Sequence, residues 1–363
     1  MRILHLYSSL STGGIEAMIV GLSNTMSATE EVEIGLTYKP KPTDFFLKKL
    51  DSKIKVHDFG KTKPGLEPGL PFKILKFIQK NKYDVVHIHG YFFYYMLGIL
   101  FYHKKIKFYY TVHNDAFLEN TRWDRKILSI KKKFFKKGWL RPFTISDASQ
   151  ESFKKLYGEC NDIKIFNGIS TPKINEEVKA SMSEYRLTPS TKLFINPGRI
   201  GEQKNQAVLA KVIDRLNREG HDIVLLMAGR IENHNVYAEL EPYLCDRIVY
   251  LGERDEIPSM MAGCDALSLP SNWEGLPVVL LEALSVGCIP ICSPVGGIKN
   301  VVTDGIDGIL LSGSTEQDIY EGFLRFLKLS DDDLKALREN CRATFENYRI
   351  ENTAAHYLEA YRN

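Results

Sequence analysis

Two glutamates separated by seven residues stand out in the second half of the chain. In the sequence SNWEGLPVVLLEALSVG, the residues from Gly275 onward predict a helix, with Pro277 suited to its first turn. Glu274 lies directly before this helix, and Glu282 lies inside it. The free N–H groups at a helix start bind anions, so the turn at Gly275 and Leu276 predicts a phosphate site with a carboxylate on either side. Glutamates on a helix are usually solvated, but Glu282 sits in an apolar run where an unpaired charge is costly. The pattern favours a phosphorylated ligand with a sugar on each side, such as a nucleotide sugar.

Two cations flank a second turn of the kind that holds phosphate. Arg199 and Lys204 lie between a predicted strand and a predicted helix, where they are placed to neutralise a diphosphate. Solvated surface charge is the ordinary alternative. Near the N-terminus, Gly13 and Gly14 join a strand to a helix, which also suits phosphate. Because the spacing is not GxGxxG, a dinucleotide fold of the oxidoreductase kind is disfavoured, and a simple turn is the alternative there.

Histidines mark the ends of two predicted strands. His87 and His89 share one face of the sequence VHIHG, which is compatible with a metal pair, but no third ligand is evident and a structural role is favoured. His113 ends the strand KFYYTVH, where a lone histidine is more often a hydrogen-bonded structural residue. The only Asp-x-Asp pattern, at 331–333, begins a predicted helix, where acids are favourable in themselves. We therefore expect no metal site.

The length of the chain, 363 residues, indicates two domains, because single cores stop growing at about 250–300 residues. Residues 1–170 hold 28 basic and 16 acidic residues, a net charge of +12, whereas the remainder holds 20 and 29, a net charge of −9. A basic half suggests contact with an anionic surface or substrate, and pairing between the halves is the alternative. We expect the domains to span residues 1–170 and 171–349.

Strands and helices alternate along both halves, which predicts an α/β fold with doubly wound parallel sheets. Ligands bind at the carboxyl ends of such strands, which places Gly13, His89, His113 and Ser146 along one edge. Strands are predicted at residues 2–7, 32–38, 54–59, 84–89, 107–112, 143–146 and 163–166, and then at 192–196, 222–228, 248–251, 265–269 and 289–292.

Two stretches have the composition of a lipid-facing surface. One, YFFYYMLGILFY at 91–102, is far too short to span a bilayer. In the other, 123–140, Trp123, Ile127, Ile130 and Phe134 lie at helical spacing among six lysines. An interfacial helix on anionic lipid and an ordinary helix with a solvated lysine face explain this pattern equally well. Nucleic acid is not expected as a partner, since no known binding module is present.

The compartment is predicted from two observations. The apolar run after Arg2 has only five residues, too short for a secretory signal. The six cysteines include no CxxC pair, and Cys288 and Cys292 flank a predicted buried strand, which indicates core thiols. We therefore expect a cytoplasmic protein, with contact at the inner face of the membrane if the basic helix is interfacial.

Several of these patterns together resemble one family over nearly the whole chain. They are the E-x7-E pair within PSxxEGxPxxxLEAxxxG, the sequence GR-x4-KN at 198–205, the GGxE loop at 13–16 and the Asn-Gly turn at 167–168. They are similar to motifs of the retaining GT-B glycosyltransferases of family 4, also called glycosyl transferases group 1. The resemblance implies two Rossmann-like domains that face an interdomain cleft, with a last helix at about 350–363 that packs back on the first domain.

The resemblance also implies an activity. A sugar would pass with retention from a nucleotide sugar, expected to be a UDP-sugar, to a glycan or lipid-linked acceptor on the first domain. Bacterial cell-envelope or capsular polysaccharide is the expected product, and neither a metal nor another cofactor is expected. A sugar-nucleotide epimerase on the same fold, which needs no acceptor, and a non-catalytic nucleotide-sugar-binding protein are the alternatives.

Residue roles carry over where the motifs match. Arg199 and Lys204 would bind the donor diphosphate, Glu282 the ribose and Glu274 the transferring sugar. Family members usually carry an acid where Asn300 stands, so that position receives no role. The implied catalytic residues are Glu274, His113, Arg199 and Lys204, and the implied donor-binding residues are Gly13, Gly14, Arg199, Lys204, Gly275, Leu276 and Glu282.

Overall fold

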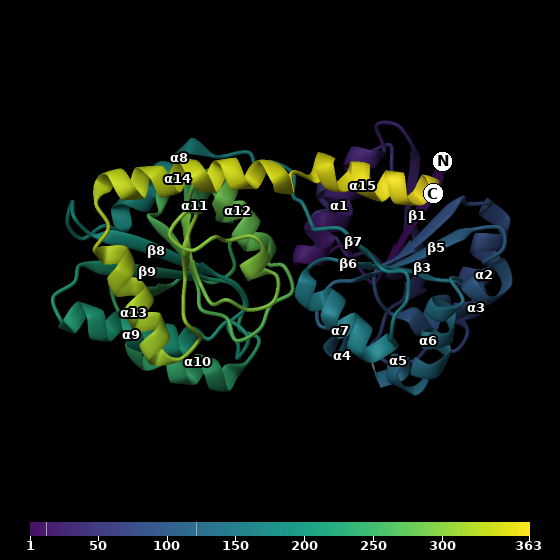
Figure 1. Cartoon of the computed structure of the whole chain (residues 1–363), viewed down its shortest axis with the longest axis horizontal. Coiled ribbons are helices and arrows are strands. Elements are labelled where there is room, and N and C mark those ends of the chain that lie inside the picture. The colour runs from purple at the N-terminus through teal and green to yellow at the C-terminus, as the bar shows by residue number, and fades with distance from the viewer. Residues whose placement is uncertain (12, 121) are drawn as a thin grey trace. The chain divides into compact units, whose positions relative to one another are not determined.

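The computed structural model describes residues 1–11, 13–120 and 122–363. The chain divides into two units: Met1–Ser170 together with Tyr348–Asn363, here called the first unit, and Thr171–Asn347, the second unit. The sequence predicts divisions after residue 170 and at residue 350. Each unit is built around one parallel sheet (Figure 1).

The sheet of the first unit has the strand order β3-β2-β1-β4-β5-β6-β7, and every described pair is parallel. Its order reverses between β1 and β4, which is where such sheets bind ligands. The central strands β1, β4 and β5 are mostly apolar because both of their faces are covered. The strands are β1 (Arg2–Tyr7), β2 (Glu31–Tyr38), β3 (Lys55–Lys61), β4 (Val85–Ile88), β5 (Lys107–Val112), β6 (Arg141–Thr144) and β7 (Ile163–Lys164).

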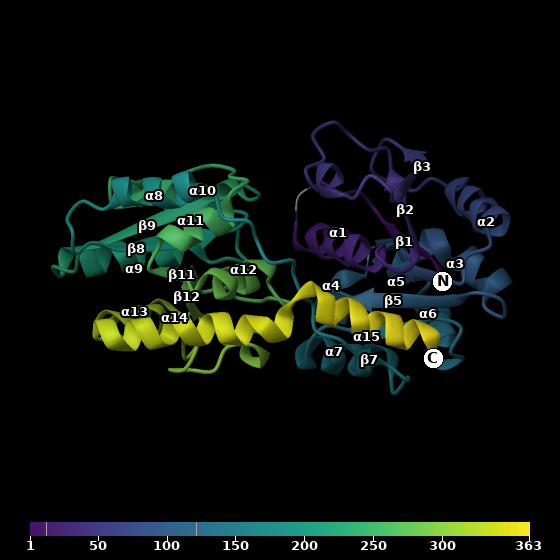
Figure 2. The ribbon, with the colours of Figure 1, turned by 90° about the horizontal axis from the view of Figure 1, so that it is seen from above.

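Helices cover both faces of this sheet. They are α1 (Gly14–Met26), α2 (Leu70–Asn81), α3 (Phe92–Tyr102), α4 (Ala116–Glu119), α5 (Arg122–Lys126), α6 (Leu128–Lys136), α7 (Asp147–Tyr157) and α15 (Ile350–Arg362). Helices α1 and α15 pack on one face of the sheet, and α2, α3, α6 and α7 pack on the other face. Each set forms a separate hydrophobic core with the strand residues that point toward it. Helices α1 and α15 lie side by side (Figure 2).

Polar contacts fasten the C-terminal helix to this sheet. The hydroxyl of Tyr109 in β5 donates to the carbonyl of Ala360 at 2.7 Å, and the hydroxyl of Tyr361 bonds to His87 in β4. Glu30 accepts from Arg362 at 2.9 Å and also pairs with the N-terminal amine. The two ends of the chain therefore lie close together.

A buried carboxylate stabilises the edge of the sheet beyond β1. Glu33, 1% exposed in β2, accepts hydrogen bonds of 2.6 Å from both Tyr83 and Arg2, and contacts His57 of β3. Burial by itself raises the pKa of Glu33, but these hydrogen bonds outweigh it and lower the pKa to about 2. The ionised form is therefore strongly favoured in the folded chain.

The sheet of the second unit has the order β10-β9-β8-β11-β12-β13, again parallel throughout the described pairs, and it reverses between β8 and β11. The doubly wound α/β prediction is confirmed in both units. The two-residue strand β13 was not predicted, whereas β7, equally short, lies inside a predicted strand. The strands are β8 (Lys192–Pro197), β9 (Ile223–Ala228), β10 (Ile248–Tyr250), β11 (Ala266–Leu269), β12 (Ile289–Cys292) and β13 (Ile309–Leu310).

The helices of the second unit also form two layers. Helices α9, α10 and α13 lie on one side of the sheet, and α11, α12 and α14 on the other (Figure 1). Asp333 completes a capping box with Ser330 at the start of α14, so the Asp-x-Asp sequence begins a helix as predicted. The helices are α8 (Glu176–Ser181), α9 (Gln206–Arg218), α10 (His234–Leu240), α11 (Ile257–Gly263), α12 (Val278–Val286), α13 (Glu316–Leu327) and α14 (Asp331–Phe345).

Candidate functional site

The turn between β8 and α9 is held in one shape by a buried side chain. Gln206, fully buried, donates from Nε2 to the carbonyl of Arg199 at 3.0 Å and accepts from the amide of Gly201 at 3.2 Å. Asn205 ends the turn in the left-handed conformation, with a φ of 59°. The side chains of Arg199 and Lys204 therefore project from a fixed backbone at the carboxyl end of β8.

Lys204 and Glu274 form a nearly buried ion pair. Lys204 Nζ lies 2.6 Å from Glu274 Oε1, and the two side chains are only 13% and 6% exposed. Gln203 Nε2 donates to Glu274 Oε2 at 3.3 Å, so both carboxylate oxygens have partners. The residues lie 70 positions apart and meet because β8 and β11 are neighbours at the reversal of strand order. Lys204, which the resemblance assigns to the donor diphosphate, is therefore in direct contact with Glu274, which it assigns to the transferring sugar.

Arg199 has a different partner and a different environment. Its guanidinium pairs with Glu232, in the loop after β9, and the two side chains are 49% and 45% exposed. Exposed pairs contribute only about 0–1 kcal/mol, so an incoming anion replaces such a partner at low cost. Glu232 also lines an open depression of about 450 Å³, together with Gln203 and Trp273. Arg199 and Lys204 thus flank this turn, each held by a carboxylate.

Helix α12 begins later than predicted. Pro277 has a φ of −72° and a ψ of 124°, an extended conformation that places it at the N-cap, and the helix starts at Val278. Gly275 and Leu276 therefore lie in the loop before the helix, not in its first turn, although both remain beside its free amides. Glu282 lies in the second turn of α12 and is half-buried.

The glycine pair Gly296 and Gly297, in the loop after β12, packs on the Glu274 loop. The amide of Gly297 donates to the carbonyl of Gly275 at 2.5 Å. Gly296 has a φ of +55°, and a Cβ atom there would lie 1.9 Å from the carbonyl oxygen of Glu274. Only glycine fits this position. The signal available in the sequence was the Gly-Gly dipeptide after a buried strand, but nothing in the sequence indicated what it touches.

The first unit places its candidate residues along the carboxyl edge of its sheet. Gly13 is the N-cap of α1 and Gly14 its first residue, and both are exposed. His113 directly follows β5 and is 6% exposed. Burial lowers the pKa of His113 to about 3, so the ring is neutral at physiological pH. The backbone amide of His113 donates to Glu119 at 3.1 Å.

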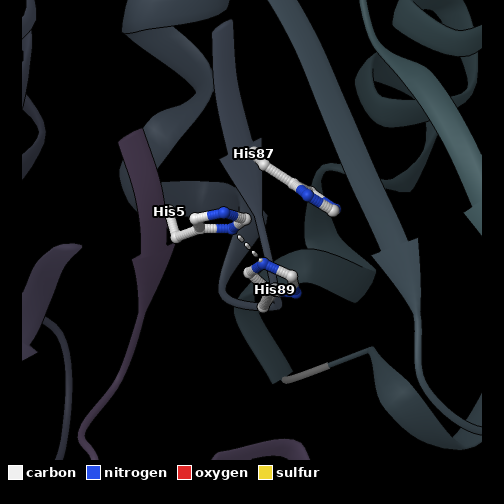
Figure 3. A group of neighbouring side chains, drawn as sticks. All are labelled: His5, His87 and His89. Carbon is white, nitrogen blue, oxygen red and sulfur yellow. Dashed lines mark hydrogen bonds between the residues drawn. The ribbon is translucent and has the colours of Figure 1, made fainter. Parts of the chain in front are cut away.

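His5 joins His87 and His89 in a cluster that the sequence did not connect (Figure 3). One ring nitrogen from each lies within 4.8 Å of the others, a wide spacing for ligands that bind zinc at about 2.0 Å. His87 already uses its two nitrogens on the hydroxyls of Thr111 and Tyr361. Hydrogen bonding therefore accounts for this ring, and the expectation of no metal site stays a prediction.

The basic stretch at 123–140 forms two helices, α5 and α6, that meet at Ile127. Phe134 packs in the core at 3% exposed. Lys131 is 1% exposed, with Nζ 3.1 Å from Asn120 Oδ1 and 3.9 Å from the ring centre of Tyr110. These two side chains therefore cannot belong to a lipid-facing surface, because this face of α6 packs on the sheet, as in the second of the two alternatives. Among the lysines and apolar residues of the predicted pattern, those that remain exposed are Lys126, Ile130, Lys133, Lys136 and Lys137.

The aromatic stretch at 91–102 is mainly core. Phe92, Tyr95 and Ile99 are fully buried, whereas Phe101 near the end of α3 is 64% exposed. Across the described parts of the chain, no helix combines the length and the apolar character needed to cross a membrane.

Comparison with known proteins gives this arrangement a class and a family. Residues 178–344 match the family described as Glycosyl transferases group 1, and residues 12–171 match Glycosyltransferase Family 4. The fold and the matched halves define a glycosyltransferase (EC 2.4) of the GT-B type. The chain belongs to family 4 of these enzymes, as the sequence motifs predicted.

Individual relatives agree with this assignment. The chain is 29% identical over 298 residues to the UDP-Gal:alpha-D-GlcNAc-diphosphoundecaprenol alpha-1,3-galactosyltransferase of Escherichia coli, which covers 76% of this chain and 73% of that protein. It is 26% identical over 263 residues to an uncharacterized 41.2 kDa protein in the cps region of Klebsiella pneumoniae, covering 68% and 70%. The crystal structure of Anabaena HepE in complex with UDP and glucose superposes with a TM-score of 0.82 at 18% identity, covering 99% of both chains. That likeness establishes the fold.

Proposed function

We propose that this enzyme transfers a sugar, with retention, from a UDP-sugar to a glycan carried on a lipid diphosphate, in the synthesis of a bacterial surface polysaccharide. Support for the donor and the acceptor comes from the relatives, one of which is named as a UDP-Gal-dependent transferase acting on a diphosphoundecaprenol-linked sugar. A second relative lies in a cps region. In this proposal the donor binds the second unit and the acceptor the first.

The observation that carries the proposal is the Lys204–Glu274 pair at the strand-order reversal. A lysine and a carboxylate, both nearly buried and 2.6 Å apart, stand beside the free amides of α12. The donor diphosphate would bind Lys204, Arg199 and these amides, while Glu274 would accept from hydroxyls of the transferring sugar and Glu282 from the ribose. Two protein cations then offset the phosphate charge, which removes the need for a metal.

The reaction follows from this charge distribution. The bond between the anomeric carbon and the diphosphate oxygen breaks as the acceptor oxygen bonds on the same face of the sugar. The acceptor proton passes to the leaving diphosphate, whose growing charge Arg199 and Lys204 stabilise. Neutral His113 would hydrogen-bond the transferring sugar, because burial keeps its ring uncharged.

The test is transfer by a Glu274→Ala variant, assayed with UDP-galactose and UDP-glucose and a lipid-diphosphate-linked sugar. We expect kcat/KM to fall about 10²–10³-fold, as for loss of one group that stabilises a transition state. The matched control is Glu239→Ala, which removes an exposed carboxylate from α10 of the same unit and should leave transfer unchanged. Unchanged transfer in Glu274→Ala would refute the site. Turnover of the UDP-sugar to an isomer without acceptor would identify an epimerase instead, and binding without any turnover a non-catalytic protein.

Membrane contact is a separate part of the proposal. The exposed lysines of α5 and α6 stand on the unit that would receive the lipid-linked acceptor, and each basic residue near an anionic surface contributes about 1 kcal/mol. The contact would thus hold the enzyme where its acceptor is, at the inner face of the membrane.

A further inference from the structure

Three hydrogen-bonded imidazoles form a chain that ends at His113. His5 lies on β1, His89 directly after β4 and His113 directly after β5, all on the sheet face that α1 and α15 cover. His5 Nδ1 lies 3.0 Å from His89 Nε2 (Figure 3), and His89 Nδ1 lies 3.0 Å from His113 Nε2. No ring is more than 6% exposed. The chain connects the proposed sugar contact to the interior of the sheet.

The proton positions in this chain depend on one another. Burial lowers the pKa of His5 and His113 to about 3 and that of His89 well below its ordinary value, so each ring is neutral and carries one N–H. Both 3.0 Å contacts are satisfied only when all three protons sit on Nδ1 or all three sit on Nε2. Any mixed arrangement sets two N–H groups, or two bare nitrogens, against each other.

The two ends of the chain decide between these arrangements. His5 Nε2 and His113 Nδ1 are buried, and neither has a hydrogen-bond partner within the described residues. In each arrangement one end presents an unpaired N–H and the other a bare nitrogen. Because a buried donor without a partner is costly, a hydrogen-bonding group that reaches His113 Nδ1 selects the arrangement of the whole chain.

We propose that His89 is a positioning residue that, through its bond to His113, sets whether His113 Nδ1 donates or accepts a hydrogen bond toward the ligand, and that His5 follows the same arrangement. The inference rests on the proposed function at one point, that the group meeting His113 is a hydroxyl of the transferring sugar. A hydroxyl that accepts from Nδ1 places all three protons on Nδ1, and a hydroxyl that donates to Nδ1 places all three on Nε2. His5, which is fully buried, then reports the occupancy of His113.

Nuclear magnetic resonance of the full chain with ¹⁵N-labelled histidine tests the coupling, because protonated and bare ring nitrogens resonate apart. In the free protein, the fraction with the proton on Nδ1 should be equal for His5, His89 and His113. UDP-galactose should move all three fractions in the same direction, whereas UDP, which lacks the sugar, should leave them unchanged. Unequal fractions in the free protein would overturn the proposal, and so would one equivalent of zinc in the purified protein, since a metal at His5 and His89 would replace their hydrogen bond.

Two isosteric variants separate positioning from a general structural role. His89→Asn keeps a hydrogen-bonding group where Nδ1 faces His113, whereas His89→Gln keeps one where Nε2 faces His5. We expect the KM for the donor to stay within about 2-fold in the first and to rise about 3- to 10-fold in the second, the effect of one lost hydrogen bond. Equal losses in both would count against positioning.

A control and a cross-check complete the design. His87→Asn alters a ring that is tilted by 34° against that of His89, with centres 4.1 Å apart, but lies outside the chain, so the fractions at His5 and His113 should stay equal. If His113→Ala transfers sugar at the normal rate, the proposed contact between His113 and the sugar is wrong. The coupling of the three histidines is tested separately, by whether the fraction with the proton on Nδ1 is equal for all three in the unsubstituted protein. If the His89 variants do not fold, that measurement remains the decisive one.

Discussion

Replacing Glu274 by Gln should change sugar transfer and UDP affinity in opposite directions. In the structure Lys204 Nζ lies 2.6 Å from Glu274 Oε1, so a diphosphate must compete with this carboxylate in order to bind the ammonium group. The amide of Gln fills the same space but attracts Lys204 less strongly. UDP lacks the sugar that Glu274 would contact, so UDP should bind the variant more tightly. Transfer from the UDP-sugar should fall, because the variant loses the carboxylate that accepts from the sugar hydroxyls.

The size of the effect follows from the kind of contact that is lost. In the variant Lys204 keeps a hydrogen bond to the amide oxygen but loses the attraction between opposite charges, which is about 1 kcal/mol at 4 Å even in bulk water. The side chains of Lys204 and Glu274 are 13% and 6% exposed, so solvent screens little of this attraction. About 1 kcal/mol less competition for Lys204 corresponds to a roughly 5-fold lower Kd for UDP, which isothermal titration calorimetry measures directly.

The matched control is Glu232→Gln, which makes the same chemical change at the partner of Arg199. Because that pair is 49% and 45% exposed, its contribution is small and the Kd for UDP should change by less than about 2-fold. Weaker or unchanged UDP binding in Glu274→Gln would refute the competition argument. A similar gain in both variants would mean that net charge, and not the buried pair, governs affinity.

Three further outcomes are expected. Glu33→Gln should lower the free energy of unfolding of the first unit by about 3 kcal/mol at pH 7, because the pKa of Glu33 is about 2 in the folded chain against an ordinary 4.5. This stabilisation is complete above pH 4.5 and is lost as the pH falls toward 2, so the urea unfolding curves of the two proteins should converge in acid. Gly296→Ala should destabilise the second unit by more than the control Gly305→Ala, for which about 1 kcal/mol is expected. Gly305 has a similar positive φ, +74°, but a Cβ atom there would meet nothing within 4 Å, so equal costs would show that the contact with the Glu274 carbonyl adds nothing to the cost of the backbone conformation. Charge reversal of three exposed lysines should weaken sedimentation with phosphatidylglycerol vesicles about 100-fold or more, and undiminished binding would end the membrane hypothesis; the three are Lys133, Lys136 and Lys137.

Much of the candidate site could be named from sequence, but its contacts could not. Motif spacing singled out Lys204 and Glu274, because a turn at a helix start needs specific residues at fixed offsets. Their direct pairing depends on β8 and β11 being neighbours, which the sequence does not state. The same reason hid His5: it lies 84 residues before His89, and only the pairing of β1 with β4 brings the two rings together.

Sequence alone determined the fold class and most strands, since apolar runs between turns are a local property; β1, β5 and β12 begin and end where the sequence predicted. Local signals failed where a neighbour decides the outcome. Pro277 indicated a first helical turn, yet in the structure it has an extended backbone at the N-cap. Lys131 belonged to a lysine run that is compatible with either solvent or lipid, and only the packing of α6 on the sheet buries it. Helical periodicity gives the relative directions of side chains, whereas the tertiary structure decides which direction is the interior.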